Sequence, residues 1–378
     1  MPEPIYLDHN ASTPLCAAAR AAMLPLLDGA FGNPSSGHWA GRPARAAVER
    51  ARAEVAALLG ARPDEIVFTS GGSEANNAAL AGLWRLRGRS GGRVVISAVE
   101  HPAVTEPCRR LAAEGARVVV LPVDAQGRVD PADLARELAR GDGEVALVSV
   151  MHANNETGAL QPVAELARLA RTAGVPFHTD AAQSCGKVPV GVDDLGVDLL
   201  SLAGHKLYGP KGIGALYVRR GTPWAPFILG AGHEGGRRAG TESALLCAGL
   251  GAAAAAAALP AGEGVWRLRD ALWDRLRAAL GDGVVLLGPV AERLPNTLYV
   301  GFRGLFGGDL LARCPELAAS TGAACHAGGR ELSATLRAMG VAPEIGLGAV
   351  RLSLGRDNSA EEVARAAEML IGAAGAGR

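Results

Sequence analysis

The sequence of 378 residues predicts an α/β fold, with a large domain built on a mostly parallel seven-stranded sheet and a smaller α+β domain. Between residues 66 and 218, short apolar runs alternate with helix-like stretches. Such alternation is typical of a parallel sheet that is covered by helices on both faces. The chain is also long enough to bury two hydrophobic cores.

Seven apolar runs predict buried strands, because they are short and are bounded by polar or glycine-containing segments. In chain order they span residues 66–68, 94–96, 118–121, 145–148, 176–178, 199–200 and 214–218. Helices are predicted between them at residues 73–86, 102–114, 131–139 and 162–173. A longer apolar run, residues 244–259, contains two glycines and is too short to span a membrane, so a buried alanine-rich helix is expected there.

The tripeptide Gly262-Glu263-Gly264 predicts a hinge into a second unit. Beyond it, strands are expected at residues 284–287, 297–300 and 350–354, and helices at 332–339 and 360–371. We therefore expect a large domain of residues 13–261. The small domain is expected to combine residues 1–12 with residues 262–378.

Charge and cysteine content restrict the class of protein. The net charge is zero at pH 7, so no polyanionic partner such as nucleic acid is expected. The N-terminus lacks a basic region followed by an apolar one, so neither a signal peptide nor a membrane location is expected. The six cysteines are scattered without a Cys-x-x-Cys pair, which argues against a zinc site or a disulfide framework. We expect no metal and a reducing, cytoplasmic location.

Lysine is rare in this chain, which has only Lys187, Lys206 and Lys211 among 38 lysines and arginines. Arginine can replace lysine as a charge, but it cannot form a Schiff base because it stays protonated. Lys206 follows a predicted strand, and Asp180 ends the strand before it. This pair fits an enzyme that uses pyridoxal 5'-phosphate (PLP), in which a carboxylate keeps the pyridine nitrogen protonated and a lysine binds the aldehyde.

Three further segments follow predicted strands and suit a cofactor site. Gly72 and Ser73 open a helix after a glycine-rich turn, where free N–H groups can bind phosphate, although an ordinary strand–helix turn is the alternative. His101 could stack on a cofactor ring and move protons, or be structural. His205 could donate to phosphate, or simply be packed.

Substrate-binding and nucleophilic candidates lie in the remaining polar segments. Arg351 lies inside an apolar strand and needs an anion, either a substrate carboxylate or a structural salt-bridge partner. Asn155 follows a strand, and we favour a binding role for it over a turn. Cys325 is surrounded by small residues and followed by His326, which suits either a nucleophile or an incidental thiol.

These segments, in this order, resemble the PLP-dependent cysteine desulfurases and selenocysteine lyases of the class V aminotransferase fold. The resemblance spans nearly the whole chain and includes Tyr-Leu-Asp-His-Asn-Ala-Ser-Thr-Pro at residues 6–14, Gly-Asn-Pro-Ser-Ser at 32–36 and Gly-Gly-Arg-Arg-Ala-Gly-Thr-Glu at 235–242. It implies fold type I of the PLP-dependent transferases, a homodimer, and a site built from two subunits.

The resemblance also implies a role for each candidate residue. Lys206 would form the Schiff base and act as the base, and Asp180 would hold the pyridine nitrogen. Gln183 would hydrogen-bond the ring hydroxyl, and His101 would stack on the ring. The phosphate would be held by Gly72, Ser73, His205 and the partner subunit's Thr241. Asn155 and Arg351 would hold the substrate carboxylate, and Cys325 would accept the sulfur.

The activity implied is conversion of L-cysteine to L-alanine, with the sulfur passing to Cys325 as a persulfide and then to an acceptor protein. A selenocysteine lyase is the nearest alternative, because residues 322–326 and 203–206 are closer to that group. Ala203 also replaces a serine that is usual in desulfurases. Another class V β-lyase or aminotransferase, or a catalytically silent scaffold, are the further alternatives.

Overall fold

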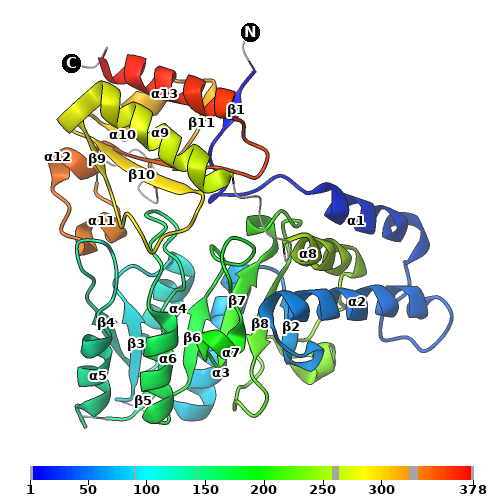
Figure 1. Cartoon of the computed structure of the whole chain (residues 1–378). Helices are drawn as coiled ribbons and strands as arrows, with labels where there is room; N and C mark the ends of the chain where they lie inside the picture. The colour runs from blue at the N-terminus through cyan, green and yellow to red at the C-terminus, as the bar shows by residue number, and fades with distance from the viewer. Residues whose placement is uncertain (1–2, 89–90, 142, 258–263, 323–330, 376–378) are drawn as a thin grey trace.

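The computed structural model describes residues 3–88, 91–141, 143–257, 264–322 and 331–375 (Figure 1). A seven-stranded sheet lies in the lower part of the view, and a smaller sheet with its own helices lies above it (Figure 1). Among the described residues, no helix combines the length and the apolar character needed to cross a membrane.

The large sheet has the strand order β2-β8-β7-β6-β5-β3-β4. β8 is antiparallel to both of its neighbours, and all other pairs are parallel, as predicted for a mostly parallel sheet. The strands are β2 (Ile66–Thr69), β3 (Arg93–Ser97), β4 (Arg117–Leu121), β5 (Val145–Ser149), β6 (Phe177–Asp180), β7 (Leu199–Ala203) and β8 (Gly214–Val218). All seven predicted strands are therefore confirmed.

Helices cover both faces of this sheet, because successive side chains of a strand point to opposite faces and the apolar ones on each face must be buried. Val94 and Ile96 of β3 pack in a cluster with α3 and α4, whereas Val95 packs in the larger cluster with α2, α6 and α8. The helices of this unit are α1 (Ala17–Gly29), α2 (Gly41–Leu59), α3 (Gly72–Arg87), α4 (Pro102–Ala113), α5 (Pro131–Ala139), α6 (Val163–Thr172), α7 (Val192–Leu195) and α8 (Ala244–Ala257). The 3-10 turns are η1 (Pro63–Glu65), η2 (Gly204–Lys206) and η3 (Glu234–Gly236).

The alanine-rich helix α8 packs closely against α1 and α2. A Cβ on Gly249 would lie 2.6 Å from the Met23 sulfur, and a Cβ on Gly251 would lie 2.5 Å from Ala51 Cα. Glycine disfavours a helix interior, but here it permits contacts that any side chain would block. The prediction of a buried, alanine-rich helix is confirmed.

The smaller unit is an antiparallel sheet of order β12-β10-β9. Ile5 and Leu7 from the N-terminal segment pack in its core. Its elements are β1 (Ile5–Tyr6), α9 (Val265–Leu280), η4 (Gly281–Gly283), β9 (Val284–Leu286), β10 (Thr297–Phe302), α10 (Gly307–Ala312), β11 (Leu317–Ala318), α11 (Ala334–Ala338), α12 (Pro343–Gly346), β12 (Ala349–Ser353) and α13 (Ala360–Gly375). The division into two domains stays a prediction, since residues 258–263 lie outside the described part of the chain.

Candidate active site

The candidate site is a cavity of about 380 Å³ at the carboxyl ends of the parallel strands. β2 and β7 are each antiparallel to β8, so β2 runs with the parallel strands and also ends at this edge. Side chains that follow parallel strands meet at one edge of the sheet, where α/β proteins bind ligands. Nine predicted site residues line the cavity: Gly72, Ser73, His101, Asn155, Asp180, Gln183, His205, Lys206 and Arg351.

Two predicted residues are not among those that line this cavity. Thr241 lies in a separate cavity of about 140 Å³, together with Glu234 and Arg238. Cys325 lies outside the described residues. Gly322, three positions before it in the sequence, lines the main cavity.

Asp180 is a buried carboxylate at the end of β6. Its Oδ1 accepts a hydrogen bond of 2.9 Å from the Ala182 N–H, and its Oδ2 accepts one of 2.6 Å from Asn76 Nδ2. These two donors fix the carboxylate at the wall of the cavity. Because charge-assisted hydrogen bonds stabilise the ionised form, Asp180 is suited to hold a positively charged ring nitrogen.

Lys206 lies in η2, directly after β7. Its Nζ donates to the backbone carbonyl of Asn10 and, at 3.0 Å, to that of Ala11. Burial lowers the pKa of Lys206 to about 8, and the positive charge of Arg351 acts in the same direction. A neutral amine, the form that attacks a carbonyl carbon, is therefore accessible near neutral pH.

His101 caps the N-terminus of α4. Its Nδ1 accepts a 3.0 Å hydrogen bond from the Ala103 N–H, so the proton of the neutral ring is on Nε2. Burial lowers the pKa of His101, and the charge of Lys206 lowers it further, while Asp180 opposes this. The ring is thus favoured in its neutral form beside the cavity.

Glu100, which precedes His101, is a buried acid that the sequence analysis did not single out. Its Oε1 accepts hydrogen bonds from the Ser97 hydroxyl and the Met151 N–H, while its Oε2 is buried without a partner. Burial raises the pKa of Glu100 to about 8.

Another part of the cavity lining fits a phosphate group. Gly72 and Ser73 form the first turn of α3, a helix of 16 residues whose N-terminal N–H groups favour anions. His205 lines the same cavity, with Nδ1 3.3 Å from the Ser12 hydroxyl. Burial, with Lys206 as the next cause, lowers the pKa of His205 to about 4, so the ring is neutral and retains one N–H.

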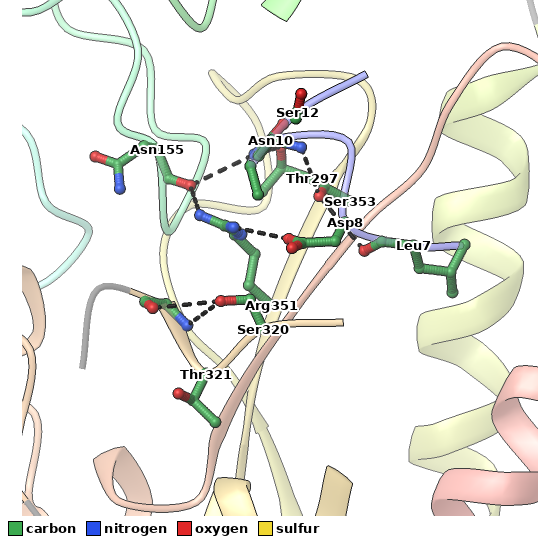
Figure 2. Close-up of polar contacts among 12 residues, drawn as sticks. Leu7, Asp8, Asn10, Ser12, Asn155, Thr297, Ser320, Thr321, Arg351 and Ser353 are labelled. Atoms are coloured by element: carbon green, nitrogen blue, oxygen red, sulfur yellow. Dashed lines mark hydrogen bonds and ion pairs between the residues drawn. The ribbon is translucent and has the colours of Figure 1, made fainter. Parts of the chain in front are cut away.

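Arg351, on β12, already has two oxygen partners (Figure 2). Its Nη1 donates to the Asn155 carbonyl oxygen at 2.8 Å, and its Nη2 lies 2.8 Å from Asp8 Oδ1. Nε is buried without a partner. The salt-bridge alternative is therefore present in the structure, while the guanidinium still borders the cavity.

Asn155 meets Arg351 through its backbone only. Its side-chain amide points away from the guanidinium (Figure 2). Both residues line the cavity. The role of Asn155 in substrate binding stays a prediction.

Comparison with known proteins places this cavity in a family. The aminotransferase class-V family model matches residues 5–366. Cysteine desulfurase IscS from Dictyoglomus turgidum is 42% identical over 368 residues, covering 96% of this chain and 92% of the relative. Cysteine desulfurase NifS from Azotobacter vinelandii is 44% identical over 368 residues, covering 96% of this chain and 90% of the relative.

The chain belongs to the cysteine desulfurase group of the class-V aminotransferase family.

Solved structures of similar proteins agree with this family. A NifS-like protein superposes with a TM-score of 0.90 at 33% identity, covering 98% of both chains. SspA in complex with cysteine superposes with a TM-score of 0.82 at 34% identity, covering 93% of this chain and 98% of that one. The predicted fold of this family, with its seven-stranded sheet, is thereby confirmed.

Asn10 is another residue of this desulfurase-family site that the sequence analysis missed as a functional candidate. Its backbone carbonyl accepts from Lys206 Nζ and from Gln183 Nε2, the latter at 2.9 Å. Its side chain bonds Lys187 Nζ at 2.8 Å and Thr297 Oγ1 at 2.8 Å. Asn10 thus joins the N-terminal segment, the large sheet and β10 at one point. The only signal in the sequence was its place in the segment of residues 6–14.

Proposed function

We propose that this chain is a PLP-dependent cysteine desulfurase that converts L-cysteine to L-alanine and receives the sulfur on Cys325. The observation that carries the proposal is that Asp180, Lys206 and Arg351 border one cavity. A carboxylate, an amine of lowered pKa and a guanidinium are the groups needed for a pyridinium, an aldehyde and an amino-acid carboxylate. The names of the relatives support this reaction.

The residues of the cavity fit PLP. Asp180 would hold the ring nitrogen, Lys206 would bind the aldehyde, and Gln183 would contact the ring oxygen. Gly72 and Ser73, at the start of α3, would hold the phosphate. When bound, PLP supplies an electron sink for the negative charge that develops on the substrate.

Residues of this chain would move the protons of the reaction. Lys206 can act as a base near neutral pH, because burial brings the pKa of its amine to about 8. Arg351 would hold the substrate carboxylate and so present the α-proton to Lys206. His101, neutral and carrying its proton on Nε2, would pack on the ring and return a proton.

The sulfur step is an attack of the Cys325 thiolate on the substrate sulfur. An S–S bond forms on Cys325, the bond between the substrate β-carbon and sulfur breaks, and its electron pair remains with the carbon that becomes the alanine methyl group. Three buried cysteines, Cys108, Cys185 and Cys247, are poor candidates for this role. Burial raises the pKa values of Cys108 and Cys185 to about 12, and that of Cys247 rises as well.

A homodimer would complete the site. Thr241 does not line the main cavity of its own chain, in agreement with a role toward the partner subunit. Phe31 and Trp39 pack edge to face and are 79% and 75% exposed. Leu24 and Leu27 on α1 are also exposed. We propose that a second copy covers these apolar side chains, which monomers rarely expose together. An acceptor protein for the sulfur and a cytoplasmic location stay predictions.

The first experiment is to measure alanine release from L-cysteine and from L-selenocysteine, under reductant, with the wild type and Cys325→Ala. We expect turnover of L-cysteine that Cys325→Ala abolishes. Lys206→Ala is the control that should remove activity toward both substrates. If only L-selenocysteine is turned over, or Cys325→Ala retains full activity with L-cysteine, the protein is a lyase and the persulfide step is wrong.

A further inference from the structure

Lys187 is a half-buried lysine beside the site, with no role in the reaction proposed above. Its Nζ donates to Asn10 Oδ1 at 2.8 Å and to Gln183 Oε1 at 3.1 Å. Within the described ranges, no carboxylate forms an ion pair with it. Burial lowers its pKa well below the usual lysine value, and the charges of Lys206 and Arg351 add to this effect. Keeping a half-buried amine with only neutral partners is unfavourable for stability, which indicates a use for it.

The contacts of Lys187 help to determine which way two amide groups face, together with Asn296 Nδ2, which donates to Asn10 Oδ1 at 3.1 Å. A lysine amine donates to its neighbours, so the oxygens of Asn10 and Gln183 must turn toward it. The Gln183 NH₂ group then lies on the other side, where one N–H donates to the Asn10 carbonyl at 2.9 Å. Since Gln183 lines the cavity, its second N–H is the group available to a ligand oxygen.

We propose that Lys187 is a positioning residue of the cofactor site, which fixes Gln183 so that an N–H, rather than the carbonyl oxygen, faces the bound ligand. This inference rests on the proposed function, because it assigns the ring oxygen of PLP as the acceptor for that N–H. Without Lys187, Gln183 Oε1 would lose its donor. The side chain could then relieve the loss by turning its oxygen toward the cavity, where it would repel the oxygen of the ring.

Lys187→Met tests the proposal, because methionine retains the length of the stem and removes the donors. Lys187 also borders a neighbouring cavity of about 200 Å³, which leaves room for the thioether. We expect the cofactor-free variant to bind PLP about tenfold more weakly than the wild type, as measured by equilibrium dialysis. Its thermal midpoint should be equal to or above that of the cofactor-free wild type, because an unfavourable burial is removed.

A double-mutant cycle separates positioning from charge. If Lys187 acts through Gln183, the double variant Q183A/K187M should bind PLP no more weakly than Gln183→Ala alone. Lys211→Met, at the exposed third lysine, is the matched control and should bind PLP as the wild type does.

Four outcomes would overturn the inference. PLP binding by Lys187→Met that equals the wild type would do so, as would losses that add in the double variant. A variant that unfolds, or whose thermal midpoint falls by several degrees, would show that Lys187 is structural. A wild type that takes up no PLP would overturn the proposed function together with this inference. This outcome differs from a failure of the inference alone, because the wild type itself then lacks PLP binding.

Discussion

The Nη2 atom of Arg351 lies 2.8 Å from Asp8 Oδ1, so a guanidinium at the cavity wall is paired with a carboxylate from the N-terminal segment. The two charges act in opposite directions on Lys206. Arg351 lowers the pKa of the Lys206 amine, and Asp8 raises it. Residues from both ends of the chain therefore set the protonation of the lysine that lies between them in sequence.

The first prediction follows from these opposing effects. The rate at which the cofactor-free protein forms a Schiff base with PLP should rise with pH around 8, because only the unprotonated Lys206 amine attacks the aldehyde. Arg351→Gln should move this midpoint to higher pH, and Asp8→Asn should move it to lower pH. Stopped-flow absorbance over pH 6 to 10 measures both. Shifts in the same direction would show that changes in packing, rather than charge, determine the reactivity.

The second prediction concerns the shape of Arg351. The guanidinium uses separate nitrogens for Asn155 and Asp8, and a lysine amine cannot reproduce that fork. Arg351→Lys should raise KM for L-cysteine by about tenfold or more, with a smaller change in kcat, since the substrate carboxylate would lose a bidentate partner. Steady-state alanine release gives both constants. An unchanged KM would mean that Arg351 serves only as the partner of Asp8.

The third prediction concerns Glu100 and pH. Its pKa is raised to about 8 in the folded protein, so the folded state binds the proton more tightly than the unfolded chain does. The stabilisation from this proton is full below the unfolded pKa of about 4.3 and is lost as the pH rises through 8. Glu100→Gln cannot ionise, so its thermal midpoint relative to the wild type should increase from pH 5 to pH 8. Thermal unfolding of the cofactor-free proteins measures this difference.

The exposed Glu368 on α13 provides the matched control for Glu100. Glu368→Gln should show no such trend with pH. A difference between Glu100→Gln and the wild type that stays constant over this range would show that Glu100 is ionised in the folded protein, which would contradict the assignment of a neutral acid.

The large sheet could be predicted because its strands are apolar on both faces and are separated by regular helices. The helices α1, α2 and α9 were missed, since their buried faces are made largely of alanine or interrupted by arginine. The antiparallel direction of β8 could not be predicted from the sequence either, because a buried strand has the same apolar pattern whether it runs parallel or antiparallel to its neighbours. The pairing partners decide its direction, and these are distant in sequence.

The candidate site was predicted where a residue type has a distinctive chemistry, as with Lys206 and Asp180. Asn10 and Asn76 were missed because an asparagine that supports a site is indistinguishable in sequence from one in a turn. Asn76 lies on the buried face of α3 and bonds Asp180, which only the packing of α3 on the sheet reveals. Lys187 was noted as a rare lysine, yet its contact with Gln183 needed the structure.

The final prediction concerns a buried ion pair that holds the segment before Thr241. Glu234 accepts from Arg52 Nη1 at 2.7 Å, from Arg52 Nη2 at 2.8 Å and from the Phe68 N–H at 2.8 Å. Its φ of +51° is uncommon for a residue other than glycine, so these bonds hold it in a disfavoured conformation. Glu234→Gln would leave the buried Arg52 charge with only the exposed Glu49, 3.3 Å from its Nε, as an ionic partner, and should lower the free energy of unfolding by about 3 kcal/mol.

Urea denaturation of the cofactor-free proteins would measure the loss. The double variant R52M/E234Q should be more stable than Glu234→Gln alone, since it no longer buries a charge whose remaining ionic partner, Glu49, is exposed. Glu114→Gln breaks the exposed pair with Arg110 and should cost less than about 1 kcal/mol. If Glu234→Gln were equally mild, water would have to reach Arg52, and the buried ion pair would not be what fixes the conformation of this segment.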